Sequence, residues 1–417
     1  MSKINELPPR KIEIHDTTLR DGLQSRFWID TGKIYPTSND RLEIAAALMR
    51  FGIRYIEVFS PNVNEGEAED LGRIIQTRDE VQNELGKPIH ILVHARCDPK
   101  DTQAALKYNI DGFNLYFGLS RESQKDNHGY SVDEIITKAE PLIAEIRRNY
   151  PDLILRFSGE DAFRSDLDDI FRVYDSIAPW VDRFGFPDTV GVANPHFVED
   201  RLGQLMQRYP GKRFEGHFHN DTGLALINAL TAFNAGMKDM QTTILGFAER
   251  SGIVSMSAFL LNLYRINPDL LEGYNIGESY LLNVLLASIM KTQVPPNEPV
   301  SLTNRTHSAG VHAKAVLNNA KVYEAHPLQE FGVTERKLLL GPLSGVHIIQ
   351  YTLAHILNFQ NIPLNVANEV TRIFKNRTSR IKPEETILGI LEEIAISNGL
   401  KKQTLPVTHI EKLDNGG

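Results

Sequence analysis

Strand-like segments followed by helical stretches recur along residues 11–250, and this repetition constrains the fold more than any other sequence feature. The segments are Lys11–Thr18, Tyr55–Pro61, Ile89–Ala95, Gly112–Ser120, Leu153–Asp161, Arg183–Val190, Arg213–Asp221 and Met240–Gly246. Such a series, at about 250 residues, is typical of a (β/α)8 barrel. An open nucleotide-binding sheet is disfavoured because no glycine-rich phosphate loop follows the first segment. The sequence therefore predicts an α/β protein, a (β/α)8 TIM barrel followed by a mostly helical C-terminal region.

The alternation of strand and helix stops after residue 265. A proline-rich stretch, Pro295–Pro299, reads as a linker, and the apolar pattern beyond it is helical. We therefore expect a catalytic barrel over residues 1–265, linker helices over 266–300 and a helical subdomain over 301–417. The helices expected in this subdomain are Gly345–Leu357, Leu364–Asn376 and Lys382–Ser397.

Composition excludes several classes of protein. The net charge of -8 and the absence of long basic runs argue against a nucleic-acid partner. Cys97 is the single cysteine, so no intramolecular disulfide forms, as expected in a reducing compartment. The N-terminal residues lack the apolar core of a signal peptide, and no apolar run reaches membrane-spanning length. We expect a cytoplasmic protein without a membrane partner.

Polar side chains gather where the expected strands end, which is where barrels of this class carry their sites. They are Arg20, Asp21, Glu57, His94, Glu160, Asp188, Thr189, His217, His219, Glu249 and Arg250. The sequence therefore predicts one site at the C-terminal end of the barrel.

His217 and His219 lie two residues apart on an expected strand, so their side chains share a face. Asp21 follows the first strand, whose end lies near that of the seventh in a closed barrel. Two histidines and a carboxylate, with positions left open, can hold a Lewis-acid cation: Zn, Mn, Mg or Co. The alternative is a pair of buried, hydrogen-bonded histidines without a metal. Arg20 could neutralise an alkoxide or a carboxylate, or form a structural ion pair with Glu57; both can hold.

Two motifs carry a family resemblance: Asp-Thr-Thr-Leu-Arg-Asp-Gly at 16–22 and His-Phe-His-Asn-Asp-Thr-Gly at 217–223. Together they resemble the DRE-TIM metallolyase superfamily, which includes isopropylmalate, homocitrate and citramalate synthases and hydroxymethylglutaryl-CoA lyase. Four further stretches are most similar to homocitrate synthase: 156–165, 188–191, 246–253 and 309–315, with Tyr323 after the last.

The resemblance implies roles for individual residues. The metal ligands would be Asp21, His217 and His219; the substrate contacts Arg20, Gln24, Glu57, Arg156, Ser158 and Thr189; and the catalytic residues Arg20, Glu160, His312 and Tyr323. Arg156 and Ser158 would hold a distal carboxylate, and a buried guanidinium left unpaired would penalise substrates without one. The family supplies the residue matching His312 from a partner subunit, which implies a homodimer with exchanged C-terminal regions.

The implied reaction is a Claisen-type condensation of acetyl-CoA with a 2-oxo dicarboxylic acid, followed by thioester hydrolysis. The substrate closest to the resemblance is 2-oxoglutarate. Asp98 departs from the pattern, because homocitrate synthases carry a histidine there, near the distal carboxylate; a carboxylate facing that group would repel it. Oxaloacetate, as in a Re-type citrate synthase, and the substrate of isopropylmalate synthase therefore remain alternatives.

Two other functions remain open. The first is an acyl-CoA lyase, which in this superfamily relies on a cysteine-bearing loop; the position of Cys97 beside the third strand argues against it. The second is a non-catalytic paralogue that binds metal and metabolite. Retention of the metal set together with His312 and Tyr323 argues against this alternative.

Overall fold

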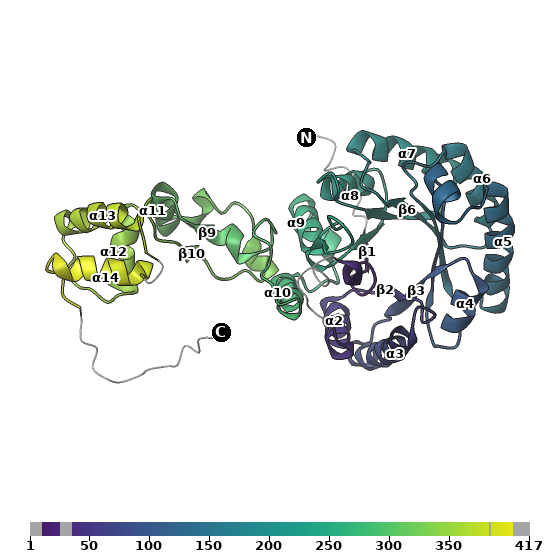
Figure 1. The fold of residues 1–417 in the computed structure, drawn as a ribbon, viewed down its shortest axis with the longest axis horizontal. Helices are drawn as coiled ribbons and strands as arrows, with labels where there is room; N and C mark the ends of the chain where they lie inside the picture. The colour runs from purple at the N-terminus through teal and green to yellow at the C-terminus, as the bar shows by residue number, and fades with distance from the viewer. Residues whose placement is uncertain (1–10, 26–35, 383–384, 403–417) are drawn as a thin grey trace. The chain divides into compact units, whose positions relative to one another are not determined.

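A computed structural model describes residues 11–25, 36–382 and 385–402. Its larger unit is a closed barrel of parallel strands ringed by helices, which confirms the predicted fold (Figure 1). The strands are β1 (Glu13–Asp16), β2 (Tyr55–Phe59), β3 (His90–Arg96), β4 (Gly112–Gly118), β5 (Ile154–Glu160), β6 (Arg183–Asp188), β7 (Arg213–Phe218) and β8 (Asp239–Thr242).

Neighbouring strands pair in sequence order, and β1 pairs with β8 to close the sheet on itself. In that closing pair Glu13 lies opposite Asp239 and Asp16 opposite Thr242. Because all strands run in parallel, their carboxyl ends meet at one mouth of the barrel. The register therefore places the loops after β1, β7 and β8 side by side.

Helices between the strands form the outer ring. They are α2 (Ser38–Phe51), α3 (Glu65–Leu85), α4 (Pro99–Ala105), α5 (Val132–Asn149), α6 (Leu167–Ile177), α7 (Pro195–Arg208) and α8 (Ala225–Asn234). Thr37 and Ser131 each begin a helix with a reciprocal capping box. Aromatic side chains such as Phe113, Phe157 and Phe184 are fully buried. The apolar core of the barrel lies between strands and helices.

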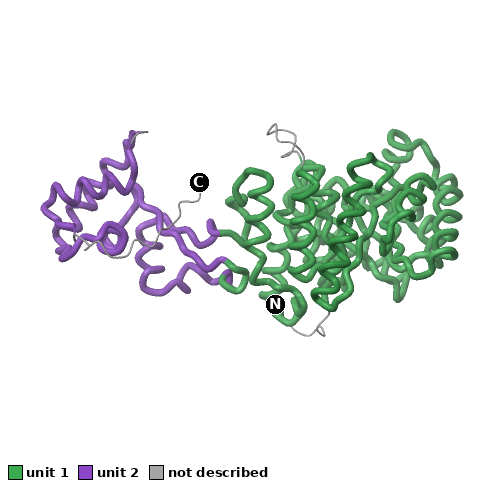
Figure 2. The backbone as a smooth tube through the Cα atoms, turned by 90° about the horizontal axis from the view of Figure 1, so that it is seen from below, with its two compact units in different colours: residues 1–301, 329–332 green, residues 302–328, 333–417 purple. Residues whose placement is uncertain are grey.

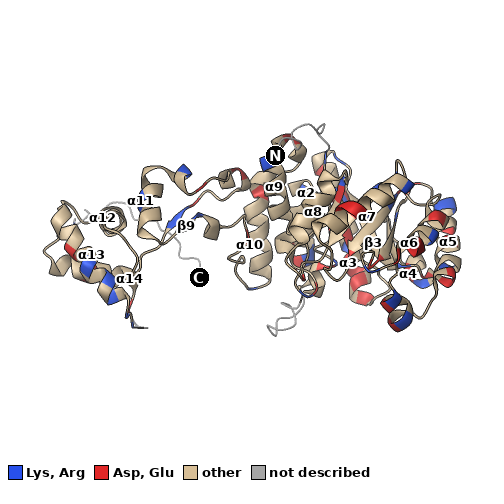
Figure 3. Ribbon diagram, turned by 90° about the horizontal axis from the view of Figure 1, so that it is seen from above, with Lys and Arg blue, Asp and Glu red and all other residues tan. Residues whose placement is uncertain are grey.

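The rest of this unit is helical. A turn η4 (Ile244–Gly246) follows β8. The strand ends at Thr242 and not at Gly246 as expected, because Leu245 and Gly246 have positive φ angles of 60° and 67°. Helices α9 (Met256–Ile266) and α10 (Ser279–Ile289) come next. Both are rich in apolar residues, and α10 carries no acidic or basic side chain (Figure 3).

Residues 302–328 and 333–417 form a second compact unit, drawn in purple in Figure 2. It contains β9 (Thr306–His307) paired with β10 (Lys337–Leu338), and helices α11 (Gly310–Asn318), α12 (Val346–His355), α13 (Leu364–Thr378) and α14 (Ile387–Ser397). Ile349, Leu353, Val370, Phe374 and Leu391 build its own apolar core. Among the described residues no helix combines the length and the apolar character that a membrane span requires.

Candidate active site and metal centre

The carboxyl ends of the strands surround a cavity of about 320 Å³. The predicted residues that line it are Arg20, Asp21, Gln24, His94, Arg156, Ser158, Glu160, Thr189, His217, His219, Glu249 and Arg250. The cavity is also lined by residues that were not predicted from the sequence, among them Asn62, Asp101, Tyr116 and Gln241. The structure thus brings the barrel part of the predicted site together. Glu57 lies buried below the cavity as the partner of its arginines.

Asp21, His217 and His219 form a compact cluster at this mouth. The Nε2 atoms of His217 and His219 lie 3.4 Å and 3.8 Å from Asp21 Oδ2. All three side chains are buried, and their potential ligand atoms lie within 4.8 Å of one another. The donor set fits one cation with positions left open for other ligands.

Hydrogen bonding sets the tautomer of His217. Gln241 donates through Nε2 to Glu57 Oε2 at 2.9 Å, so its Oε1 accepts from His217 Nδ1 at 2.6 Å. The Nε2 atom of His217 therefore carries a lone pair and faces the Asp21 carboxylate. Burial, with His219 beside it, lowers the pKa of His217 to about 3, so the ring is neutral.

His217 Nε2 and Asp21 Oδ2 are two acceptors that face each other, an arrangement that suits a bound cation. Asp21 Oδ2 is a buried oxygen with no hydrogen-bond partner among the described residues. Burial alone would raise the pKa of Asp21, but the attraction of Arg20, His217 and His219 outweighs it and lowers this pKa. The carboxylate is thus ionised, and the cluster fits a divalent metal held by one carboxylate and two neutral imidazoles.

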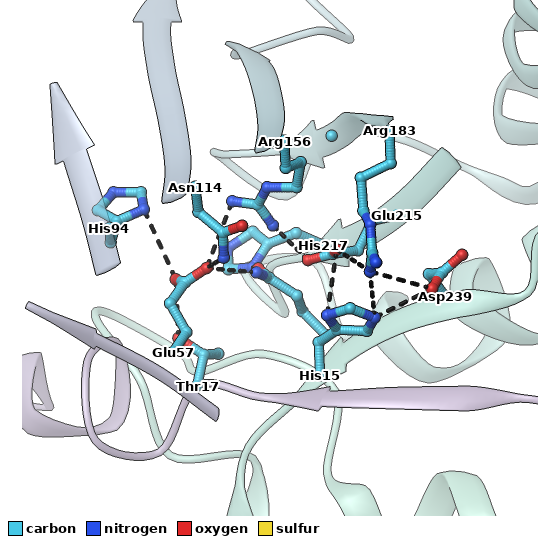
Figure 4. A network of polar contacts seen from close by, with 12 residues as sticks. His15, Thr17, Glu57, His94, Asn114, Arg156, Arg183, Glu215, His217 and Asp239 are labelled. Carbon is cyan, nitrogen blue, oxygen red and sulfur yellow. Dashed lines mark hydrogen bonds and ion pairs between the residues drawn. The ribbon is translucent and has the colours of Figure 1, made fainter. Parts of the chain in front are cut away.

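Glu57 on β2 organises the residues beneath the cluster (Figure 4). Its Oε1 accepts from Arg20 Nε at 2.6 Å and lies 3.6 Å from His94 Nδ1. Its Oε2 accepts from Gln241 and from Asn114. Arg20 therefore forms the expected ion pair with Glu57. It also lines the cavity, 3.5 Å from Asp21, and its contact with a substrate anion stays a prediction.

Arg156 is already paired. One terminal nitrogen donates to Glu215 and the other lies 3.4 Å from Glu57 Oε2. The expectation that a missing substrate anion would leave this guanidinium unpaired is therefore wrong. Only its Nε is buried without a hydrogen-bond partner among the described residues. Arg156 therefore lines the cavity with a guanidinium whose charge is balanced by two carboxylates.

A second layer of charges fills the barrel below Arg156 (Figure 4). His15 lies 3.2 Å from Glu215 and 3.0 Å from Asp239. Arg183 lies 3.4 Å from Asp239 and 3.6 Å from Glu215. Barrels of this class usually fill their interior with branched apolar side chains. Here paired charges take that place and support the site from beneath.

Glu160 stands out at the end of β5. No hydrogen bond to its carboxylate is found within residues 11–25, 36–382 and 385–402. Burial raises the pKa of Glu160, against the attraction of Arg20. A carboxyl group that is unengaged and raised in pKa suits proton transfer.

Thr189 is oriented by the backbone. Its Oγ1 accepts from Asp161 N at 2.8 Å, so the hydroxyl hydrogen is left to donate elsewhere. Asp161 holds a left-handed φ of 62°, a costly conformation that recurs at functional sites. The Ser158 hydroxyl fills the space beside Gly185 that a side chain would need. A Cβ added at Gly185 would lie 1.7 Å from Ser158 Oγ.

Asp98 does not line this cavity. It begins α4, and its carboxylate accepts from Lys100 N at 2.8 Å. On β3, His94 lines the cavity, and its ring stacks on Tyr116 with ring centroids 4.5 Å apart. Burial, with Arg20 nearby, lowers the pKa of His94 to about 3. Side chains two residues apart on a strand share a face. This alternation along β3 could have shown that Arg96 points to the same side as His94.

His312 and Tyr323 belong to the second unit. Their rings stack with centroids 3.9 Å apart, and both side chains are exposed. His312 lies on α11, and Tyr323 follows the turn Ala320–Val322. The two rings form a stacked pair that is open to solvent.

Comparison with known proteins decides the family. Residues 11–282 match the HMGL-like family model, and residues 300–381 match the model described as homocitrate synthase post-HMGL domain-like. The chain belongs to the HMGL-like family. The superfamily resemblance drawn from the two sequence motifs is confirmed.

Homocitrate synthases are prominent among the relatives. This HMGL-like chain is 32% identical to the mitochondrial homocitrate synthase of Schizosaccharomyces pombe over 94% of its own length and 89% of that protein. It is 30% identical to a probable 2-isopropylmalate synthase of Ignicoccus hospitalis, over 92% and 94% of the two chains. The HMG-CoA lyase structure from Bacillus subtilis shares the fold, with a TM-score of 0.58 at 20% identity, over 69% of this chain and 97% of that one.

Proposed function

We propose that this HMGL-like protein condenses acetyl-CoA with a 2-oxo acid and then hydrolyses the thioester to release CoA. The observation that carries the proposal is the cluster of Asp21, His217 and His219, which faces an unengaged carboxyl group, Glu160, across one cavity. The homocitrate synthase names of the relatives support the same acyltransferase reaction.

A divalent metal held by Asp21, His217 and His219 would polarise the carbonyl of the 2-oxo acid as a Lewis acid. Arg20 lies beside this cluster and stabilises negative charge that develops on the carbonyl oxygen. Thr189 offers its free hydroxyl hydrogen to the substrate carboxylate. Gln24 is exposed at the same mouth and contacts the bound acid.

Carbon–carbon bond formation requires removal of a proton from the acetyl methyl group. Glu160 and His312 are the acid–base residues, and the stacked Tyr323 orients the His312 ring. We propose that α11 of a second copy supplies His312 in a homodimer. Size measurement in solution tests this: a strictly monomeric, active enzyme would contradict the exchange.

The far wall of the cavity selects the tail of the 2-oxo acid. Arg156 lines this wall with a guanidinium that is paired to Glu215 and Glu57, Ser158 supplies a hydroxyl and His94 a neutral ring. These donors favour an anionic or strongly polar tail over a branched apolar one. We therefore propose a 2-oxo dicarboxylic acid, with 2-oxoglutarate first. Asp98 caps a helix outside this wall, so it gives no reason to disfavour that acid.

Release of free thiol from acetyl-CoA across a panel of 2-oxo acids tests the proposal. We expect turnover with 2-oxoglutarate or oxaloacetate and little with pyruvate. Preference for 2-oxoisovalerate would instead support the isopropylmalate synthase alternative, which one relative's name favours. Thiol release with none of the acids would contradict the condensation altogether. Relatives carry both cytosolic and mitochondrial names, so cytoplasmic placement stays a prediction.

A further inference from the structure

Tyr174 lies on α6, in the outer ring of helices, and its buried side chain reaches the sheet between β5 and β6. Its hydroxyl accepts from Gly159 N at 3.0 Å and donates to Gly185 O at 2.8 Å. Gly159 directly precedes Glu160, the carboxyl group assigned to proton transfer. We propose that the Tyr174 hydroxyl holds the end of β5 and so positions the Glu160 carboxyl, an inference that rests on the function proposed above.

The hydroxyl takes the place of a backbone hydrogen bond. Strands β5 and β6 pair in parallel, and the last pair in their register is Ser158 with Gly185. A regular parallel ladder continues from such a pair with a bond from the next N–H, that of Gly159, to Gly185 O. Tyr174 instead stands between these two groups and bonds to both. The spacing of the strands at this point is therefore set by a side chain that comes from a helix.

A proline keeps the two strands from resuming the ladder. Peptide groups two residues apart on a strand face the same neighbouring strand, so residue 187 of β6 faces β5 as Gly185 does. That residue is Pro187, which has no N–H to donate. Its carbonyl accepts from Ala162 N at 3.1 Å, beyond the end of β5. On its other side β5 pairs with β4 as far as Glu160, so the strand is held more regularly there.

Glu160 depends on the backbone for its position. Its carboxylate has no hydrogen bond among the described residues, so its place is set by the strand end that carries it. The amide before it, Gly159 N, is held by Tyr174. The amide after it, Asp161 N, donates to Thr189 Oγ1 at 2.8 Å. Two hydroxyl groups thus fix the peptide groups on either side of a proton-transfer residue, where a small displacement changes the rate strongly.

The Tyr174 side chain is itself held rigidly. Its ring stacks on Phe184 with centroids 4.1 Å apart and meets Phe157 edge-on at 5.9 Å. Gly159 leaves room for it, since a Cβ added there would lie 3.2 Å from Tyr174 Cε1. Burial raises the pKa of Tyr174, so the hydroxyl keeps the proton that it donates to Gly185. A side chain fixed by packing can hold a backbone group in one place.

Removal of the hydroxyl tests this role. Tyr174→Phe keeps the ring, and we expect kcat to fall about 10- to 100-fold because the acid–base group is displaced. The KM for the 2-oxo acid should stay within about twofold. Tyr209→Phe is the matched control: its ring lies 6.2 Å from that of Tyr174, but its hydroxyl bonds to Phe171 O and Asp175 instead of a strand. The control should keep a normal kcat, and equal losses in the two variants would overturn the proposal.

A second background separates positioning from a general loss of stability. In Glu160→Gln the group to be positioned is absent, so adding Tyr174→Phe should lower kcat by less than about twofold. A loss as large as in the wild-type background would show that Tyr174 acts on something other than Glu160, and would overturn the proposal. Thermal unfolding of each variant confirms that it is folded.

Amide exchange at Gly159 does not depend on the proposed reaction. Gly159 N should exchange slowly in the wild type and faster in Tyr174→Phe, whereas Tyr209→Phe should match the wild type. Fast exchange in the wild type would overturn the proposal, even if Tyr174→Phe did not fold. If exchange behaves as expected while no 2-oxo acid supports thiol release, the proposed reaction fails and the hold of Tyr174 on β5 stands.

Discussion

The mouth of the barrel and the interior beneath it are both rich in charge, but their charges are used differently. At the mouth, Asp21 Oδ2 has no hydrogen-bond partner among the described residues and faces the neutral ring of His217 at 3.4 Å. In the interior, Glu215 and Asp239 each lie beside an arginine, and His15 bridges them. Arg183 Nε in the interior also lacks a hydrogen-bond partner among the described residues, but the interior charges lie beside charges of opposite sign. A carboxylate that faces another acceptor indicates where a cation binds, whereas paired charges hold other side chains in place. Four changes test this difference.

Removal of the metal should have the largest effect, because the unpaired acceptors at the mouth then have nothing to bind. We expect turnover to disappear after chelation and return with added divalent metal. The melting temperature should fall, since a ligand at a hundredfold excess over its Kd stabilises by about 2.7 kcal/mol. Asp98→Asn, which removes a carboxylate outside the cavity, should keep the full response to chelator. Undiminished turnover in a metal-free sample would refute the Lewis-acid role.

Substitution of His312 should come next. We expect His312→Ala to lower kcat by about 10²–10⁴-fold, the usual contribution of a general acid–base group. The KM for the 2-oxo acid should change little. His326→Ala, at another exposed histidine of the same unit, is the control and should be near normal. A variant with normal kcat but a raised KM would reassign His312 to substrate binding.

Substitution in the interior should affect stability rather than the metal. Asp239→Asn leaves Arg183 short of a partner, and breaking a buried pair costs about 3–5 kcal/mol. Denaturant unfolding measures this. Glu84→Gln breaks an exposed pair with Arg50 and should cost far less, because water screens that pair. Equal losses in the two variants would mean that the interior charges do not support the fold.

The buried carboxylate of Asp239 should also make the free energy of unfolding depend on pH. Burial alone would raise the pKa of Asp239, but hydrogen bonds and attraction from His15 and Arg213 hold it well below its usual range. A depressed pKa adds stability above the unfolded value, about 3.9, which is lost as the pH falls toward the folded pKa. The free energy of unfolding should therefore decrease below about pH 4, and less steeply in Asp239→Asn.

The smallest effect is expected at Asp98. Asp98→His should leave the KM for 2-oxoglutarate within about twofold and cost about 1 kcal/mol through the lost helix cap. Steady-state kinetics and denaturant unfolding measure the two quantities. A tenfold lower KM would place residue 98 against the substrate and restore the argument for repulsion.

The alternation of strands and helices, together with the polar residues at the strand ends, was enough to predict the barrel and the position of its cavity. Strand alternation fixed His217 and His219 on one face, and the closed order of strands brought Asp21 to them. The interior pairing was not predictable, because Arg156 and Glu215 are 59 residues apart and no periodicity shows that they meet. The orientation of Asp98 was left open for a related reason: the chain turns after Arg96, so Asp98 caps α4 and lines a neighbouring cavity instead of the metal cavity.

The charged interior also bears on how the chain reaches its folded state. His15, Arg183 and Asp239 come from β1, β6 and β8, separated by up to 224 residues. A partial barrel would bury some of these charges without their partners, at a cost of several kcal/mol per ion. Half-formed barrels are therefore penalised, and long-range closure becomes the slow step of folding. We expect the strands to close together as one cooperative event.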